Sequence, residues 1–397
     1  MKYLIGSKEQ KQFRMAGMVM FASWCALVLW RIVMYFLPIE NDLAADAAFT
    51  LPVQLGILLA LPYLSYRFGL KMSDREVLAF SNVRKCPVPA LLVAVPLGFC
   101  AFFATIGIST LWQTFLMLLG YNHSYSTTAY PEQFNVFMFL ASLFLTAVLP
   151  AVCEEFSVRG GLLTAVASTK HRDSAVLLMG LLFGLFHQNV TQFFYTALFG
   201  MVMAYIALKH RSILPCMIVH FINNGVSVYL DYAEAYGWWG YNFYDWINAR
   251  LQSNAFSILT LYVLILGLTV FLVYLTGRFA PDDTPRKTRP ADHAPDAPMV
   301  NVNPFEDTGI NPFAEDVPPH GAFDPFDPFA PAQPIDPFDG KPLDPFAGGP
   351  PGTPHPAPRP SPSDVAFRPS LRDKAFYIGA IVLSVLTTLF SFFWGLF

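Results

Sequence analysis

The chain has 397 residues, of which 54% are hydrophobic and 13% are charged. Soluble globular domains carry about 25% charged residues, so this composition argues against a cytosolic enzyme, a nucleic-acid-binding protein and a disulfide-stapled secreted module. The formal net charge of −3 averages two unlike parts of the chain. Residues 281–374 hold 15 of the 28 acidic residues and 8 of the 25 basic ones, whereas the remaining residues carry an excess of positive charge.

Nine apolar stretches outside that acidic segment are candidates for membrane helices, which need about 20 residues each. They predict an all-α, polytopic transmembrane helical bundle, with eight helices in a membrane domain of residues 1–280 and one more at the C-terminus. In chain order the stretches are 15–37, 51–68, 88–119, 135–169 (interrupted by Pro150), 174–188, 192–208, 213–229, 255–277 and 375–397.

The basic residues between these stretches indicate how the bundle is oriented. Outside 281–374 the chain has 17 Lys and Arg residues, and fourteen of them fall in segments expected on the same side of the membrane as the N-terminus. Arg31 and Arg159 lie inside spans, and Arg250 lies in a loop on the other side of the membrane. Cytoplasmic loops are enriched in Lys and Arg. We therefore expect an integral protein of a bacterial plasma membrane, with the N-terminus and residues 281–374 in the cytoplasm and the C-terminus outside. The aromatic outer segment 236–246 suits an interfacial belt, or alternatively a cap over an opening on that side.

Residues 281–374 contain 24 of the 33 prolines and few Val, Ile or Leu residues. Such a segment cannot bury enough apolar surface to offset its chain entropy, so we expect it to be disordered. It repeats Asn-Pro-Phe and Asp-Pro-Phe units, which present isolated Phe side chains and suit a multivalent docking partner. Low-complexity drift, or a tether for the last helix at 375–397, explains the segment equally well.

Ionisable residues are costly inside a membrane, and by default they indicate a functional site. Here they cluster in the stretches 151–160, 183–187 and 220–225. Counting from the nearest basic loop at 1.5 Å per residue places Glu154, His187 and Asn224 at a similar depth on three helices. His220 comes one turn nearer the loop. We therefore predict one polar site inside the bundle.

The spacing within each stretch suggests chemistry. Glu155 and Arg159 are four residues apart with the acid first, the favoured order for an ion pair on a helix, which leaves Glu154 to act as a base. A carboxylate and an imidazole in a partly dry cavity can activate water. Two neutral donors on one helix face, His220 and Asn224, can hold the oxyanion of a tetrahedral intermediate. This pattern favours peptide hydrolysis without a covalent intermediate.

These stretches resemble the CAAX protease and bacteriocin-processing (CPBP, or Abi) family of intramembrane glutamic proteases, over residues 135–230. Its motifs EExxxR, FxxxH and HxxxN are matched by Glu154, Glu155 and Arg159, by Phe183 and His187, and by His220 and Asn224.

The resemblance implies that Glu154 and His187 activate the hydrolytic water and that His220 and Asn224 form the oxyanion site. Glu155, Arg159 and Phe183 would support them. It implies an endopeptidase acting on membrane-associated or CaaX-like peptides, with no cofactor and no metal. Members of the family also act in bacteriocin immunity or as membrane scaffolds without proteolysis, and this is the main alternative function.

Other interpretations remain open at the sequence level. The acidic and basic residues could form a structural ion-pair cluster around packed histidines. Glu154, His187 and His220 could instead ligate zinc with one open position. A proton-relay transporter would need polar groups spread along a pathway, and we expect the remaining spans to be nearly free of them.

Overall fold

The computed structural model describes residues 7–121, 133–253, 255–280 and 367–394. Its contacts divide the chain into two units, Met1–Asp282 with Pro362–Phe397, and Asp283–Ser361. The second unit lies outside the described residues, and so does nearly all of the segment predicted to be disordered. The Asn-Pro-Phe and Asp-Pro-Phe units with their docking partner therefore stay a prediction.

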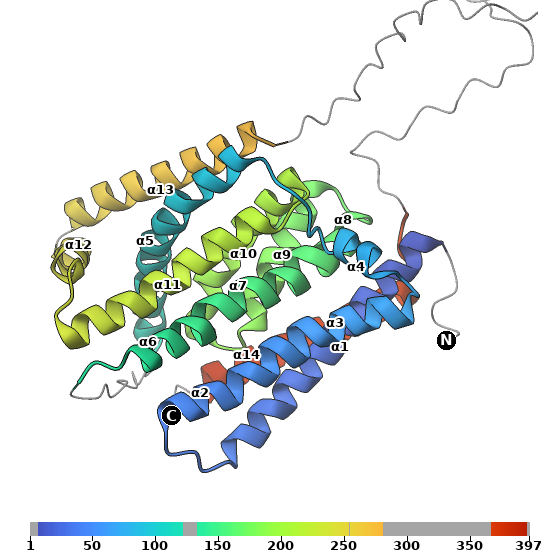
Figure 1. Cartoon of the computed structure of the whole chain (residues 1–397), viewed down its shortest axis with the longest axis horizontal. Helices are drawn as coiled ribbons and strands as arrows, with labels where there is room; N and C mark the ends of the chain where they lie inside the picture. The colour runs from blue at the N-terminus through green and yellow to red at the C-terminus, as the bar shows by residue number, and fades with distance from the viewer. Residues whose placement is uncertain (1–6, 122–132, 254, 281–366, 395–397) are drawn as a thin grey trace, which may run out of the picture. The chain divides into compact units, whose positions relative to one another are not determined.

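The described residues form helices and no strands, and the protein is an all-α, polytopic integral membrane protein (Figure 1). Within the described ranges, seven helical segments are long and apolar enough to cross a membrane. They are Lys8–Tyr35 (α1), Asp42–Gly69, Val88–Leu118 (α5), Val136–Ala167, Val190–His210 (α10), Leu259–Arg278 within α13 (Ala255–Arg278), and Leu371–Trp394 (α14).

Two of the nine predicted spans are helices that fall outside this set. α9 (Arg172–Phe186) has 15 residues and is about 22 Å long at 1.5 Å per residue, which is short for a span. α11 (Leu214–Tyr236) is long enough but carries polar residues such as His220 and Asn224 along its length. Both helices pack within the bundle, α9 against α10 and α11 against α5. The total of nine spans therefore stays a prediction.

Several details of the predicted spans are wrong, and the first of them is α1, which begins at Lys8 instead of residue 15. The second span begins at Asp42, because Asn41 caps a helix there and accepts a hydrogen bond from the Ala44 N–H. The last helix begins at Leu371 instead of 375, because Ser370 and Asp373 form the hydrogen bonds of an N-terminal cap. Pro150 does not interrupt the fourth span, which is helical throughout Val136–Ala167.

Wider π-helical turns explain how two of the spans accommodate proline and glycine. The second span consists of α2 (Asp42–Leu51), η2 (Pro52–Ala60), α3 (Leu61–Leu64) and η3 (Ser65–Gly69). The fourth consists of α6 (Val136–Leu143), η4 (Phe144–Val148), α7 (Leu149–Glu154), η5 (Glu155–Leu162) and α8 (Leu163–Ala167). Because η4 lies directly before Pro150, the backbone is already loosened where proline cannot donate a hydrogen bond. π-Helical turns of this kind are frequent at functional sites.

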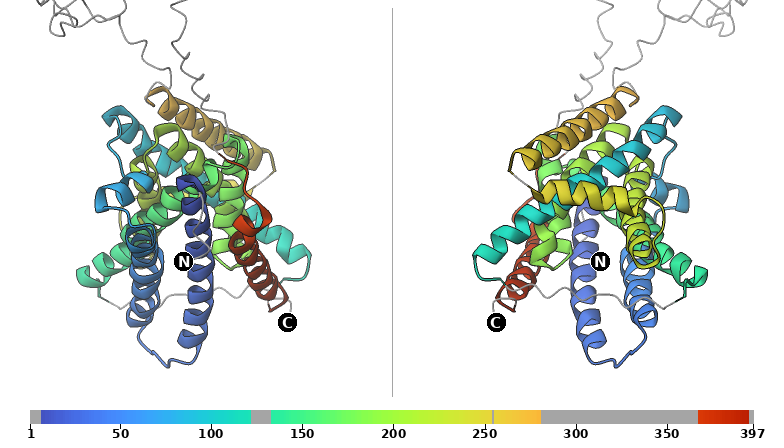
Figure 2. Two further views of the ribbon diagram at one scale, coloured as in Figure 1. Left: turned by 90° about the vertical axis from the view of Figure 1, so that its right-hand side faces the viewer. Right: turned by 90° about the vertical axis from the view of Figure 1, so that its left-hand side faces the viewer.

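Short amphipathic helices lie at the two ends of the bundle. α4 (Asp74–Phe80) follows the second span and starts with a capping box formed by Ser73 and Glu76. α12 (Tyr241–Ser253) follows α11. It is seen end-on in Figure 1 and in profile in the right-hand view of Figure 2, so it runs across the direction of α11 and α13. Neither helix is predicted from the sequence, because each is too short or too polar to match a membrane helix of about 20 apolar residues.

Close packing of α9 against α10 sets the position of the residues that follow α9. A Cβ atom at Gly180 would lie 2.6 Å from the Ala197 carbonyl oxygen, and one at Gly184 would lie 2.6 Å from that of Phe193. Both glycines are therefore required for the close approach of the two helices, and small residues four apart commonly allow such an approach between membrane helices.

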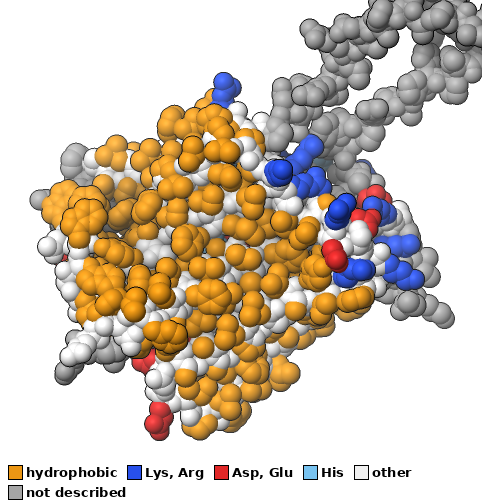
Figure 3. All heavy atoms as spheres, in the orientation of Figure 1, with side chains coloured by type: hydrophobic (Ala, Val, Ile, Leu, Met, Phe, Trp, Pro, Cys, Tyr) orange, Lys and Arg blue, Asp and Glu red, His pale blue; other side chains and the backbone are white. Residues whose placement is uncertain are grey.

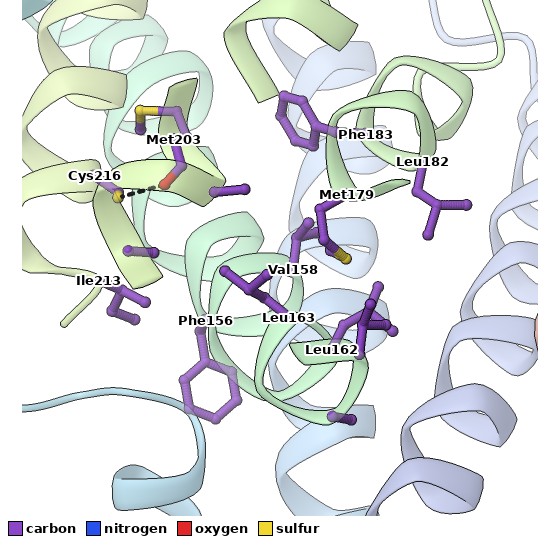
Figure 4. Packing of buried hydrophobic residues seen from close by; sticks show 14 of the residues in the cluster. Phe156, Val158, Leu162, Leu163, Met179, Leu182, Phe183, Met203, Ile213 and Cys216 are labelled. Carbon is purple, nitrogen blue, oxygen red and sulfur yellow. Dashed lines mark hydrogen bonds between the residues drawn. The ribbon is translucent and has the colours of Figure 1, made fainter. Parts of the chain in front are cut away.

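The main apolar core lies between the end of the bundle that carries α4 and the middle of the bundle. Figure 4 shows its central part, in which Phe156, Leu163, Met179 and Met203 from different helices meet. The Cys216 thiol donates a hydrogen bond of 3.3 Å to the Met203 carbonyl oxygen. This packing fills the space between η5, α9, α10 and α11 on that side.

Candidate active site

A cavity of about 830 Å³ opens among the second span, α5, the fourth span, α10 and α11. All four candidate catalytic residues line it: Glu154, His187, His220 and Asn224. They come from three places in the bundle, namely α7, the end of α9 and α11, which brings together the three stretches that the sequence places at a similar depth. Phe183 also lines the cavity, whereas Glu155 and Arg159 lie behind its wall and have no exposed side-chain surface.

Glu154 is the last residue of α7 and is 8% exposed. The Gln54 side chain in η2 donates a hydrogen bond of 2.9 Å from Nε2 to Glu154 Oε1. Gln54 is itself buried. The bond fixes one oxygen of the carboxylate, so the other oxygen is the one presented to a molecule in the cavity.

Glu155 begins η5 and joins two basic side chains, which together form what we call the core cluster: Glu155, Arg159 and His220. Arg159 Nη1 donates to Glu155 Oε1 at 3.1 Å, which confirms the predicted ion pair. His220 Nδ1 lies 2.8 Å from the same oxygen. This second contact orients the imidazole of His220 so that Nε2 points away from Glu155.

Two glycines after Arg159 let η5 pack tightly on the end of the bundle near α4. A Cβ atom at Gly160 would lie 2.7 Å from the Ser81 carbonyl oxygen, and one at Gly161 would lie 2.6 Å from the Tyr66 ring. The close contacts hold the π-helical turn that carries Glu155 and Arg159. Their side chains are therefore positioned by the backbone as well as by each other.

His187 is not on the helix as expected but caps its C-terminal end, one residue after α9. Its Nδ1 lies 2.9 Å from the Phe183 carbonyl oxygen. A carbonyl oxygen only accepts, so Nδ1 carries the proton and Nε2 of a neutral His187 is a proton acceptor. On α1, Arg31 donates from Nη2 to the His187 carbonyl oxygen at 3.1 Å, which ties down the backbone of the same residue.

The Phe183 ring contacts Arg159 and both histidines of the site. The Arg159 guanidinium lies over the ring at 3.8 Å from its centroid. The imidazole of His187 meets the ring edge-on with centroids 4.9 Å apart, and that of His220 does so at 6.3 Å. Phe183 therefore holds a buried cation on one face and shields the two imidazoles, which is the supporting position predicted for it.

Asn224 is fixed by neighbours that sequence analysis misses. Its Nδ2 donates to the Thr146 carbonyl oxygen at 2.9 Å, and its Oδ1 accepts from Asn223 Nδ2 at 3.1 Å. An amide nitrogen has two hydrogens, so one donor of Asn224 remains after the bond to Thr146. The pair His220 and Asn224 does line one side of the cavity, as their spacing of four residues predicts.

Further polar side chains line the cavity from α5 and α10, against the expectation that the remaining spans are nearly free of polar groups. They are Thr105, Ser109, Thr110 and Gln113 on α5, with Gln192 and Thr196 on α10. Each is uncharged and alone adds little to a hydropathy profile. Gln54 and Asn223 are missed for the same reason. The one sequence feature that could have indicated some of these lining residues is a glutamine or asparagine inside an apolar stretch.

Within the described ranges, no group of three or more His, Cys, Asp and Glu side chains is arranged to hold a metal ion. The zinc hypothesis for Glu154, His187 and His220 therefore finds no support in the geometry, and a chelation experiment remains its proper test.

Residues 136–226 match the family model described as type II CAAX prenyl endopeptidase Rce1-like. The matched segment contains all seven motif residues and lies within the predicted core of residues 135–230. The resemblance to the CAAX protease family is thereby confirmed for this segment, and it supports an intramembrane protease role. No curated protein and no solved structure matches the chain significantly.

Proposed function

We propose that this protein is an intramembrane endopeptidase of the glutamic type, which hydrolyses a peptide bond with water activated by Glu154 and His187. The observation that carries the proposal is the convergence of Glu154, His187, His220 and Asn224 on one cavity. The family match to residues 136–226 supports it, because the same residues make up the three motifs.

The reaction follows from the hydrogen bonds of the site. A water molecule between Glu154 and the unprotonated Nε2 of His187 loses a proton as its oxygen bonds to the carbonyl carbon of the peptide. The carbonyl oxygen becomes an oxyanion, which accepts hydrogen bonds from Asn224 Nδ2 and His220. When the C–N bond breaks, the proton taken from the water passes to the departing amine nitrogen.

The core cluster stabilises this intermediate through His220, the member of the cluster that lines the cavity. An ionised Glu155 only accepts hydrogen bonds, so Nδ1 of His220 donates to it, and His220 Nε2 donates to the oxyanion when the ring is an imidazolium. With Arg159 the cluster then carries two positive charges and one negative. Its net positive charge attracts the negative charge that develops on the oxyanion and so stabilises it.

A transporter with a proton relay fits the described residues less well. The polar lining runs from the candidate catalytic residues to one end of the bundle, whereas apolar residues such as Leu163, Met203 and Ile213 are packed on the other side. A polar route through the whole bundle is thus not formed in the part of the chain that the structure describes.

The test uses purified full-length protein in detergent with a library of lipidated and unmodified peptides. We expect Glu154→Gln and His187→Ala each to lower cleavage by about 10²–10⁴-fold, the usual contribution of a general acid or base. Glu9→Gln, at an exposed carboxylate in the first turn of α1, is the matched control and should cleave normally. Cleavage that survives Glu154→Gln contradicts the mechanism. A phenotype rescued by Glu154→Gln in cells would instead favour the immunity or scaffold role.

Chelation is a separate arm of the same assay. Incubation with a membrane-permeable chelator should leave cleavage unchanged if water is activated by Glu154 and His187 alone. Loss of cleavage that added zinc restores would establish the metal hypothesis instead.

A further inference from the structure

Basic residues mark one end of the bundle. Apart from Arg31 and Arg159, every Lys and Arg whose side chain the structure describes lies at or near the helix ends that include the start of α1, α4, the α10–α11 junction and the end of α13. Contacts confirm that these ends are adjacent: Ser212 Oγ donates to the Arg84 carbonyl oxygen at 2.7 Å, and the Arg172 guanidinium lies 5.3 Å from the Tyr205 ring centroid. Figure 3 shows blue side chains gathered at this end beside a broad apolar surface.

The opposite end carries acidic residues. Glu40 precedes α2, Asp42 and Asp46 lie in its first turns, and Asp231 and Glu234 lie in the last turns of α11. The Tyr232 hydroxyl and Ser142 Oγ are 3.2 Å apart, so the end of α11 and the start of the fourth span meet on this side. Because Lys and Arg concentrate in cytoplasmic loops, the basic end faces the cytoplasm and the acidic end faces the opposite side of the membrane.

The cavity deepens from the acidic end. Its exposed lining residues, Asp46, Thr110 and Ser227, belong to the acidic halves of their helices, whereas Glu154 and His220 are less than 9% exposed. Below the candidate catalytic residues, the core cluster and the packed apolar residues in Figure 4 fill the bundle toward the basic end. The mouth of the cavity is therefore at the acidic end and its floor holds the candidate catalytic groups.

The wall between mouth and floor is suited to a peptide backbone. Gln113, Gln192 and Asn223 line the cavity with side-chain amides, and each amide group offers both donors and acceptors. An extended peptide carries the same groups along its backbone and needs them satisfied away from bulk water. Tyr244 of α12 also lines the cavity, so part of the outer aromatic segment borders its mouth.

We propose that the substrate is an extended peptide segment exposed on the non-cytoplasmic face of the membrane, which enters the cavity from the acidic end. A CaaX tail approaching from the cytoplasm would meet the closed, basic end of the bundle. The identity of the occupant as a peptide rests on the proposed function, whereas the side from which the cavity is entered rests on the charges and the burial alone.

The test is labelling of single cysteines by a membrane-impermeant sulfonated maleimide, in sealed right-side-out and inside-out vesicles. The five native cysteines are replaced first, and Ser227→Cys and Thr110→Cys report on the mouth in two separate helices. Asp173→Cys is the control, because the Asp173 side chain is 95% exposed at the basic end.

We expect Ser227→Cys and Thr110→Cys to label at least tenfold faster in right-side-out vesicles, and Asp173→Cys to show the opposite preference. Equal or faster labelling of both mouth cysteines in inside-out vesicles overturns the proposal. If one variant does not fold, the other decides alone. Labelling requires no turnover, so this result is independent of whether Glu154→Gln abolishes cleavage.

Discussion

Two buried ion pairs of the bundle, each formed by described residues, differ in how completely their polar atoms are paired. In the core cluster, Glu155 Oε1 takes both the Arg159 and the His220 contacts, while Glu155 Oε2 and Arg159 Nε and Nη2 have no hydrogen-bond partner among the residues that the structure describes. The second pair joins α1 to α14 and forms what we call the α14 cluster: Gln10, Arg14, Ser370 and Asp373.

Every oxygen of Asp373 in the α14 cluster is paired. Oδ1 accepts from Arg14 Nε and from Gln10 Nε2, the latter at 3.0 Å. Oδ2 accepts from the N–H and the hydroxyl of Ser370 at 2.7 and 2.8 Å. The Tyr377 hydroxyl adds a bond of 3.0 Å to the Phe13 carbonyl oxygen on the same interface. A fully paired cluster far from the cavity is what a structural contact requires.

The comparison teaches that burial of charge alone does not indicate function. Both pairs are buried, but only the core cluster includes a residue that lines the cavity, His220.

The largest expected effect is at Glu155. Glu155→Gln leaves the Arg159 charge buried without compensation, which costs about 3–5 kcal/mol, and it removes the negative charge beside His220 Nδ1. We expect a large fall in thermal stability together with loss of cleavage, measured by unfolding in detergent and by peptide hydrolysis.

A double variant separates the two consequences for the core cluster. Replacing both charges, as in Glu155→Leu with Arg159→Leu, is expected to restore most of the stability because no lone charge remains. Cleavage should stay low, since His220 still lacks its partner. Recovery of both properties would show that the core cluster is only structural.

A substitution in the α14 cluster should lower the stability of the fold without lowering the peptide-cleavage activity of the folded protein. Asp373→Asn weakens charge-assisted bonds worth about 1.5–3 kcal/mol and should loosen α14 from α1. Limited proteolysis near residue 370 reports the loosening. The specific activity of the folded fraction should remain within about twofold of that of the unsubstituted protein. A fall in activity as large as that of Glu155→Gln would show that the two clusters do not differ in function.

Two glutamines give a matched comparison at a smaller scale. Gln54→Leu removes the donor to Glu154, and we expect about a tenfold to hundredfold lower kcat with little change in KM, because the carboxylate is no longer held in place. Gln10→Leu removes the corresponding donor to Asp373 and should leave kcat unchanged. Equal behaviour of the two variants would argue against a positioning role for Gln54.

The smallest effect concerns an exposed carboxylate outside the spans. The Ser73 backbone N–H and the Ser73 hydroxyl both donate to Glu76 and lower its pKa. Because the pKa is lower in the folded state, the capping box stabilises α4 above the pKa of the unfolded chain and loses that contribution as pH falls through the folded value. The protection factors of the α4 amides, which correct for the intrinsic pH dependence of hydrogen exchange, should therefore fall in acid, and Glu76→Ala should remove this fall.

The all-α membrane fold and the seven motif residues can both be predicted from the amino-acid sequence. Long apolar stretches can only be helices in a bilayer, and ionisable residues in them are rare enough to stand out. The Glu155–Arg159 ion pair follows from spacing on one helix. The short or polar helices α4, α9, α11 and α12 were predicted incompletely, since hydropathy detects length and apolarity only.

Contacts between side chains on different helices become visible only in the folded structure. Gln54 is 100 residues from Glu154, and Glu155 is 65 residues from His220, so neither hydrogen bond has a local signal. The uncharged lining of α5 and the closed basic end of the cavity depend in the same way on how helices pack side by side. Packing, which no spacing along one helix encodes, turns a set of motif residues into a cavity with a floor, a wall and a mouth.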